Sequence, residues 1–416
     1  MQKLEIFGSK KLKGRIKISG SKNSALPILA ATLLTNKKII IKNLPNVSDI
    51  KTMITLLQSL GSNIIISKSQ IVVDNSKQKK KFASYNLVKT MRAGILVLGP
   101  LLAKFGFAKV SLPGGCAIGT RPIDIHLKSL SKLGVKYKIN QGYVIAEAPR
   151  GLKGNKIRFA KISVGATENL IIAASFAKGT TVLSNCAIEP EIKDLVNFLN
   201  KMGCKIEWLS TRKIKIVGVS KLKEISYSIM FDRIEAGTYL IAAAITQGNL
   251  ILQNIIPKVI KTEIEILKKI GSKILVKKNC LQIIGNKKIK NTKIKTAPYP
   301  GFPTDLQAQI MVLLCKSNKK SIIQENIFEN RFMHVAELNR MGAKISIDGN
   351  KAIIKGNTNF QSAELMATDL RASVSLILAA LTTKGKSVIN RIYHLDRGYE
   401  NIEKKLKKVG AKIKRI

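Results

Sequence analysis

The sequence is poor in acidic and aromatic residues, and both shortages bear on its partners. Asp and Glu number 25 against 72 Lys and Arg, which gives a formal net charge of +47, and aromatic residues make up 5%. A basic chain is first a candidate for nucleic-acid binding, but such surfaces interleave basic side chains with aromatic rings that stack on bases. Here lysines occur in every segment without that interleaving. We interpret the charge as solvated lysine and expect no nucleic-acid partner, although the positive field would attract phosphate-bearing substrates.

Cysteine and histidine are also scarce, which argues against a metal site. The five cysteines are odd in number and form no CxxC pair, and the three histidines are isolated from one another. This pattern argues against a disulfide framework and a structural zinc site, and it is typical of a reducing compartment. Four of the cysteines are interpreted as small buried hydrophobic residues. They are Cys186, Cys204, Cys280 and Cys315.

Long hydrophobic runs are absent. The longest, at residues 94–103 and 170–177, are well short of the roughly 20 residues that cross a bilayer. The first 20 residues alternate charged and apolar side chains and resemble no export signal. We therefore expect a cytoplasmic protein with no membrane partner, and 416 residues are enough for two domains with separate cores.

A unit of amphipathic helix, glycine and short strand occurs six times along the chain. Two of the copies are DLVNFLNKMGCKIEW and EIEILKKIGSKILV. The glycines recur at intervals of 68 to 73 residues and are Gly61, Gly134, Gly203, Gly271, Gly342 and Gly410. Glycine readily adopts the left-handed conformation that ends a helix, so each is predicted to follow the last turn and lead into a strand.

A second, more apolar helix is predicted between these units, as in SALPILAATLL, EAGTYLIAAAI and RASVSLILAAL. Most of its circumference is apolar, so we expect it to be buried. Turns such as AKGTTV and TQGNLI then open β-branched strands. The pattern predicts a two-domain α/β protein in which three units per domain enclose three apolar helices within sheets. The boundary is expected between Gly218 and Phe231, where no helical period is found.

The loop from Ser111 to His126, SLPGGCAIGTRPIDIH, differs from every repeat. Its prolines and glycines predict two bends, which leave Cys116 outside any regular element and close to Arg121. A thiol beside positive charge can act as a nucleophile or as a proton donor, because its reference pKa of about 8.5 leaves most of it protonated at neutral pH. The alternative is a buried small hydrophobic residue, as most free cysteines are.

The motif PGGCAIGTRPID resembles the active-site loop of the UDP-N-acetylglucosamine enolpyruvyl transferases, and the resemblance covers essentially the whole chain. It implies a two-domain inside-out α/β barrel, with one domain at residues 22–229, the other at 1–21 and 230–416, and the active site in the cleft between them. It implies transfer of enolpyruvyl from phosphoenolpyruvate to the 3-hydroxyl of UDP-N-acetylglucosamine, with release of phosphate and no cofactor. We favour a monomer.

The resemblance also assigns roles to matched residues. Cys116 is implied as the general acid and Asp305 as the general base, Asp369 handles a proton, and Lys22 and Arg397 complete the catalytic set. The implied phosphoenolpyruvate ligands are Lys22, Asn23, Cys116, Arg121, Arg371 and Arg397. The implied contacts to UDP-N-acetylglucosamine are Asn23, Arg92, Arg121, Pro122, Ile123, Asp124, Ile125, Lys161, Ile162, Ser163, Val164, Asp305 and Ile327.

Local chemistry leaves alternatives at several of these positions. Lys22 could be solvated, with Asn23 as the N-cap of the helix. Asp305 could merely cap the helix that follows three prolines. Arg371 and Arg397 could form plain ion pairs with neighbouring acids, which is the usual state of such residues.

Two other functions are also weighed. A shikimate-pathway enolpyruvyl transferase would share the fold and the phosphate ligands, but it would not need the cysteine loop. A basic nucleic-acid-binding protein would explain the charge, but not six ordered repeats with acids and arginines at matched loops.

Overall fold

The computed structural model describes residues 2–8, 10–67, 69–114 and 123–416. Their contacts divide into two units. The N-terminal unit contains the described residues of 20–230, and the C-terminal unit contains those of 2–19 together with 231–416. The boundaries expected from the sequence, at 21/22 and 229/230, differ from this division by one or two residues.

Each unit contains three four-stranded sheets within the described ranges, and all six sheets share one plan. The first two strands are parallel and the remaining neighbours are antiparallel, as in the sheet that contains β10. The N-terminal sheets are β14(Ile225–Ser228)-β3(Ile39–Lys42)-β5(Gln70–Asp74)-β4(Asn63–Ser67), β6(Phe82–Ala83)-β7(Phe107–Ser111)-β9(Tyr143–Glu147)-β8(Lys136–Asn140) and β10(Lys156–Arg158)-β11(Thr180–Ser184)-β13(Lys213–Val217)-β12(Lys205–Ser210). The C-terminal sheets are β2(Lys13–Lys17)-β15(Asn249–Gln253)-β17(Cys280–Ile284)-β16(Lys273–Val276), β18(Lys293–Lys295)-β19(Ser321–Gln324)-β21(Lys351–Ile354)-β20(Ile345–Asp348) and β22(Glu364–Met366)-β23(Lys386–Asn390)-β1(Leu4–Phe7)-β24(Lys412–Arg415).

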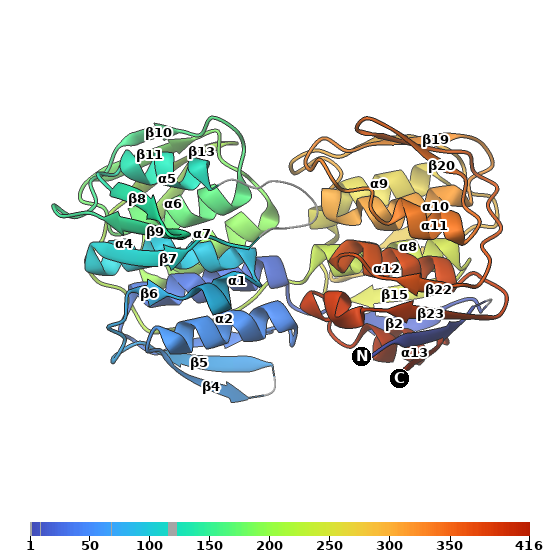
Figure 1. The fold of residues 1–416 in the computed structure, drawn as a ribbon, viewed down its shortest axis with the longest axis horizontal. Coiled ribbons are helices and arrows are strands. Elements are labelled where there is room, and N and C mark those ends of the chain that lie inside the picture. Colours follow the sequence, from blue (N-terminus) through green and yellow to red (C-terminus); the bar gives the residue numbers. More distant parts are fainter. Residues whose placement is uncertain (1, 9, 68, 115–122) are drawn as a thin grey trace. The chain divides into compact units, whose positions relative to one another are not determined.

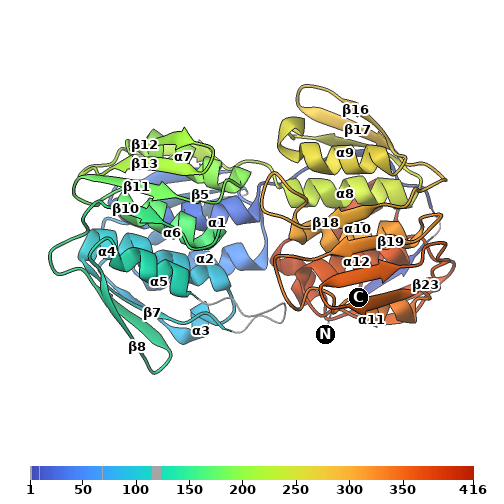
Figure 2. The ribbon, with the colours of Figure 1, turned by 90° about the horizontal axis from the view of Figure 1, so that it is seen from above.

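Apolar helices occupy the interior of each unit, with the sheets around them (Figures 1 and 2). They are α1(Lys22–Ala31), α4(Leu98–Phe105) and α6(Val164–Ala174) in the N-terminal unit, and α8(Arg233–Ile245), α10(Gln307–Cys315) and α12(Leu370–Ala380) in the C-terminal unit. Every residue of α8 and α10 is buried. The predicted α/β fold with buried helices enclosed by sheets is therefore confirmed.

The amphipathic helices pack outside the buried ones. They are α2(Ser48–Ser59), α5(Asp124–Ser131), α7(Pro190–Met202), α9(Lys261–Lys269), α11(Val335–Arg340) and α13(Ile402–Lys408). The six glycines that follow them have φ between 92° and 114°, as the repeat predicted. The short helices are η1(Thr32–Leu34), α3(Tyr85–Val88), η2(Arg92–Val97), η3(Pro257–Ile260), η4(Thr304–Leu306) and η5(Ile392–Arg397).

The segment that showed no helical period contains strand β14, which completes the first sheet of the N-terminal unit by pairing with β3. The chain then enters the C-terminal unit, where β1 lies between β23 and β24.

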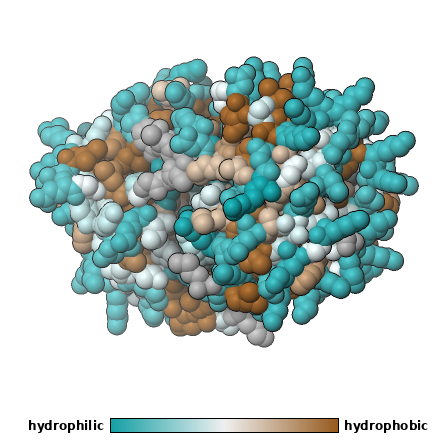
Figure 3. Space-filling view, turned by 45° about the vertical axis from the view of Figure 1, so that its right-hand side comes forward, coloured by the Kyte–Doolittle hydropathy of each residue, from teal (hydrophilic) through white to brown (hydrophobic). Residues whose placement is uncertain are grey.

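Hydrophilic side chains cover much of the face in Figure 3. No helix in the described ranges has both the length and the apolar character needed to cross a membrane.

Candidate functional site

Lys22 is the first residue of α1 and is buried, not solvated. Its ammonium lies 3.1 Å from Oδ2 of Asp49, a buried residue of α2. The N-cap of α1 is Ser21, whose hydroxyl accepts a hydrogen bond from the backbone N–H of Ser24. The alternative of a solvated lysine with Asn23 as the cap is therefore wrong, because the helix begins at Lys22 and places Asn23 inside its first turn.

Three of the segments expected to contact the nucleotide approach His126 in the N-terminal unit. Arg92 begins η2 and Asp124 begins α5, and both charges act on the imidazole. A Cβ on Gly165, in the first turn of α6, would lie 3.3 Å from Cε1 of His126. The Ser163 hydroxyl caps α6 by accepting from the backbone N–H of Ala166. Among the other predicted contacts, Ile123 is buried, Ile125 and Ile162 are half-buried, and Lys161 and Val164 are exposed.

His126 itself was not expected from the motifs. Asn169 turns its Oδ1 toward the backbone N–H of Gly99, at 2.8 Å, so its Nδ2 is the atom that faces His126 Nδ1 at 3.2 Å. His126 Nδ1 is therefore an acceptor, as in a neutral imidazole. The pKa of His126 is lowered to about 4, chiefly by burial, and the lowering by Arg92 is larger than the raising by Asp124.

The loop from Ser111 to His126 lies partly outside the described residues. Cys116, Arg121 and Pro122 all fall in that part, so their expected roles stay predictions. Of the remaining cysteines, Cys186, Cys204 and Cys315 are buried, and burial raises their pKa values to about 12, 11 and 12. Cys280 is only half-buried, against expectation, because it opens β17 directly after an exposed turn.

Asp305 is held by two arginines in the C-terminal unit. Its Oδ1 accepts a hydrogen bond from Arg331 Nη2 at 2.9 Å, and its Oδ2 accepts one from Arg371 Nη2 at 2.7 Å. Both guanidinium groups are buried, whereas the Asp305 side chain is 27% exposed. Helix α10 has no side-chain cap, so the capping alternative for Asp305 is wrong. A partly exposed carboxylate with a fixed orientation can accept a proton from a bound hydroxyl group.

Arg371 stays protonated in this setting. Burial opposes its charged form, but the negative charges of Asp305 and Asp232 and the hydrogen bond to Asp305 raise the pKa of Arg371. The sequence motifs assigned no role to Arg331. Its partner is 26 positions away along the chain, so no local signal pointed to the pair.

Asp369 and Arg397 lie near the other two histidines, His334 and His394. Asp369 caps α12 through hydrogen bonds from the backbone N–H groups of Arg371 and Ala372. Its charge acts on His334 and on His394, and Arg397 also acts on His394. Asp396, the acid beside Arg397 in sequence, forms an ion pair with Arg415, in which Asp396 Oδ1 lies 2.7 Å from Arg415 Nη2.

Glu325 organises the loop that contains Ile327. Its buried carboxylate accepts hydrogen bonds from the backbone N–H of Ile327, at 2.8 Å, and from the hydroxyl groups of Thr296 and Thr304, each at 2.9 Å. Thr304 precedes Asp305, so one carboxylate connects the segment with the expected base to the half-buried Ile327. Sequence reasoning missed Glu325, whose only local signal is an acid at the end of a predicted strand.

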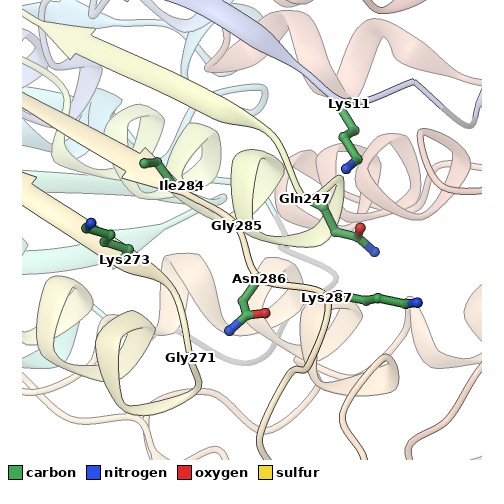
Figure 4. Close-up of a pocket in the computed structure, with 8 residues that line it drawn as sticks. All are labelled: Lys11, Gln247, Gly271, Lys273, Ile284, Gly285, Asn286 and Lys287. Carbon is green, nitrogen blue, oxygen red and sulfur yellow. The ribbon is translucent and has the colours of Figure 1, made fainter.

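An open pocket of about 380 Å³ lies elsewhere in the C-terminal unit (Figure 4). Three lysines line it, with Gln247, Gly271, Ile284, Gly285 and Asn286, and none of the predicted site residues does. Gln247 and Gly271 follow the C-terminal ends of α8 and α9, where cations are favoured. No metal-binding group of three or more acids, histidines or cysteines occurs in the part of the chain that the structure describes.

Comparison with known proteins finds relatives that match this chain over its whole given length. The sequence model of EPSP synthase (3-phosphoshikimate 1-carboxyvinyltransferase) matches residues 6–406. The chain belongs to the EPSP synthase family. Within it, the chain is 75% identical over 416 residues, and over the full length of both proteins, to the UDP-N-acetylglucosamine 1-carboxyvinyltransferase of Pelagibacter ubique (strain HTCC1062). It is 51% identical over the same length to the protein of that name from Endomicrobium trichonymphae.

Two solved structures share the fold of this chain. The enolpyruvyl transferase NikO from Streptomyces tendae aligns with a TM-score of 0.90 and 23% identity, over 100% of this chain and 98% of NikO. EPSP synthase from Acinetobacter baumannii aligns with a TM-score of 0.79 and 17% identity over the whole of both chains.

Proposed function

We propose that this protein transfers the enolpyruvyl group of phosphoenolpyruvate to the 3-hydroxyl of UDP-N-acetylglucosamine, a step of peptidoglycan synthesis. The observation that carries the proposal is the 75% identity to a UDP-N-acetylglucosamine 1-carboxyvinyltransferase, over 100% of each sequence. The cysteine motif PGGCAIGTRPID and the Asp305 carboxylate between two arginines support it.

The chemistry divides into addition and elimination. In the addition, Asp305 takes the proton of the sugar hydroxyl, whose oxygen attacks C2 of phosphoenolpyruvate, while the Cys116 thiol protonates C3. In the elimination, a proton leaves C3 and the bond from C2 to the phosphate oxygen breaks, giving the enol ether and inorganic phosphate. Asp369 is proposed to handle a proton in this exchange. Lys22, Arg121, Arg371 and Arg397 stabilise the anionic adduct.

Substrate binding uses the remaining predicted residues. Asn23 joins the phosphoenolpyruvate ligands and also contacts the sugar nucleotide. The other sugar-nucleotide contacts are proposed at Arg92, at residues 121–125 and 161–164, and at Ile327. The positive field of the chain favours both anionic substrates. The cytoplasmic location, the monomeric state and the cleft between the domains stay predictions.

One assay tests the function. Purified protein is incubated with phosphoenolpyruvate and UDP-N-acetylglucosamine, and phosphate release is followed together with the mass of the nucleotide product. We expect phosphate only when the sugar nucleotide is present, with one enolpyruvyl group added to it.

A second acceptor is tested because the matching family model carries the name of the shikimate-pathway enzyme. Shikimate 3-phosphate replaces UDP-N-acetylglucosamine in the same assay, and we expect no phosphate release. Turnover with shikimate 3-phosphate and none with the sugar nucleotide would overturn the proposal in favour of the alternative.

A further inference from the structure

Tyr399 lies in a buried polar group of side chains that ends at Asp305. Its hydroxyl is 3.2 Å from Arg371 Nη1, 2.8 Å from Thr238 Oγ1 and 3.2 Å from Gln309 Nε2. Tyr399, Thr238 and Gln309 are at most 2% exposed. They come from the turn before α13, from α8 and from α10, so this group joins the apolar helices of the C-terminal unit. The hydroxyl groups of Tyr399 and Thr238 and the Nε2 of Gln309 are hydrogen-bonded, and Gln309 Oε1 has no partner among the described residues.

The direction of each hydrogen bond follows from its partners. Thr238 donates its single hydroxyl proton to the backbone carbonyl of Ile234, at 2.8 Å, because a carbonyl can only accept. Thr238 Oγ1 is then an acceptor for Tyr399, so the tyrosine proton is committed there. The Tyr399 oxygen is left to accept from Arg371 Nη1.

Gln309 supports the same assignment. Its Nε2 donates to the backbone carbonyl of Asp305 at 2.9 Å, which fixes the orientation of the amide. The other proton of Nε2 then points toward the hydroxyl groups of Tyr399 and Thr238, at 3.2 and 3.3 Å. Burial raises the pKa of Tyr399 more than Arg371 and Thr238 lower it, so the hydroxyl remains protonated.

The Arg371 guanidinium is therefore held at two ends. Its Nη1 is directed by the Tyr399 oxygen, its Nη2 meets Asp305 Oδ2 at 2.7 Å, and its Cζ lies 5.5 Å from the centre of the Tyr399 ring. Because the guanidinium group is planar, fixing one nitrogen fixes the direction in which the other points.

We propose that Tyr399, oriented by Thr238, is a positioning residue that sets the plane of Arg371 and through it the orientation of the Asp305 carboxylate. Tyr399 acts through Arg371 and does not touch the substrates. This proposal rests on the proposed function, which makes Asp305 the base and Arg371 a phosphoenolpyruvate ligand.

The test is the variant Tyr399→Phe, which removes one oxygen and keeps the buried ring. We expect kcat to fall about 10- to 100-fold, the scale of a small misplacement of reacting groups. KM for phosphoenolpyruvate should rise, because Arg371 loses its orientation. KM for UDP-N-acetylglucosamine should stay within about twofold of the unmodified protein, because Asp305 keeps its charge and the other nucleotide contacts do not involve Arg371.

The matched control is Tyr239→Phe. Tyr239 follows Thr238 in α8, is fully buried, and its hydroxyl has no hydrogen-bond partner among the described residues. The change removes the same atom from the same core, and we expect kcat and both KM values to stay as in the unmodified protein.

Thr238→Val is a second variant that keeps the tyrosine and removes the acceptor of its proton. The freed Tyr399 hydroxyl no longer presents a fixed lone pair to Arg371. We therefore again expect KM for phosphoenolpyruvate to rise and KM for UDP-N-acetylglucosamine to stay within about twofold. The unmodified protein is assayed beside the variants, which separates failure of the proposed function from failure of this proposal. If that protein turns over and the folded variants at Tyr399 and Thr238 keep its kcat and KM values, whatever their melting temperatures, the positioning role is wrong.

Discussion

At the scale of single residues, the C-terminal unit concentrates charge around one carboxylate. Asp305 meets two buried guanidinium groups, yet over a quarter of its own side chain stays accessible. Two cations around one accessible carboxylate leave net positive charge, which suits a site for anionic substrates. The orientation of Asp305 is thus a property of the protein before any substrate is bound.

We predict that Asp305→Asn lowers kcat by about 10² to 10⁴, because the amide cannot take the proton of the sugar hydroxyl. The free energy of unfolding should also fall by about 1–3 kcal/mol, since two buried arginines lose a charged partner. Steady-state kinetics and thermal denaturation measure the two effects.

Asp396→Asn serves as the control, because Asp396 is another partly exposed aspartate with paired hydrogen bonds to one arginine. It should lose stability without a comparable loss of kcat. Full activity of Asp305→Asn would remove Asp305 from the catalytic role.

A second prediction concerns His126. Its folded-state pKa of about 4 lies below the reference value of 6.5, so the neutral imidazole contributes stability that is present above pH 6.5 and lost as the pH falls toward 4. The full difference corresponds to about 3 kcal/mol. His126→Gln has no group that titrates in this range.

Unfolding by urea at pH 7.5 and at pH 4.5 measures the difference. The free energy of unfolding should fall more steeply for the unmodified protein than for His126→Gln. Parallel pH dependence of the two proteins would mean that His126 titrates normally in the folded state.

At the scale of helices and strands, the repeat places a glycine after each amphipathic helix. Gly203 follows α7 with φ of 108° and has open space around its Cα, with the side chain of Lys223 at 3.9 Å as the neighbour of an added Cβ. The requirement for glycine is therefore conformational and not steric.

We predict that Gly203→Ala lowers the free energy of unfolding by about 1–2 kcal/mol, the cost of a left-handed L-residue. Gly203→Asn should cost less, because asparagine tolerates positive φ better than alanine. Chemical denaturation of the three proteins gives the order. An alanine variant as stable as the asparagine variant would show that backbone strain is not what selects glycine there.

The sequence predicted what is local and periodic. The six glycines and the buried helices follow from residue spacing along each segment, which helix geometry makes readable. The helix predicted from SALPILAATLL begins at Ser24, whereas α1 begins at Lys22, a difference within the range in which helix boundaries vary. The contacts of Asp305 could not be predicted, because Arg371 is 66 positions away and only the packing of α10 against α12 brings them together. The link from Tyr399 to Thr238 spans 161 positions and has no local signature.

At the scale of the whole molecule, the formal charge of +47 is carried mainly by exposed positions. Every residue of β8, KYKIN, is exposed, and the exposed lysines recur on strands of both units. Charge spread in this way attracts polyanions without selecting among them.

We therefore predict weak binding to random DNA duplexes, with a Kd of roughly 10⁻⁴ to 10⁻⁶ M near physiological salt. Fluorescence anisotropy across a salt titration measures it, with a second duplex of unrelated sequence as the comparison. Tight binding that differs between the two duplexes and persists in salt would contradict the interpretation of the charge as solvated lysine.

The position of strand β1 has a consequence for the order in which the protein folds as it is synthesised. All three sheets of the N-terminal unit are built from residues 39–228, so that unit is complete when little more than half of the chain has been made. Strand β1 is translated first, but its two neighbours are β23 and β24 near the other end, and the backbones of Lys3 and Ile416 hydrogen-bond to each other. Strand β1 must therefore wait, unpaired in its sheet, until β23 and β24 have also been synthesised.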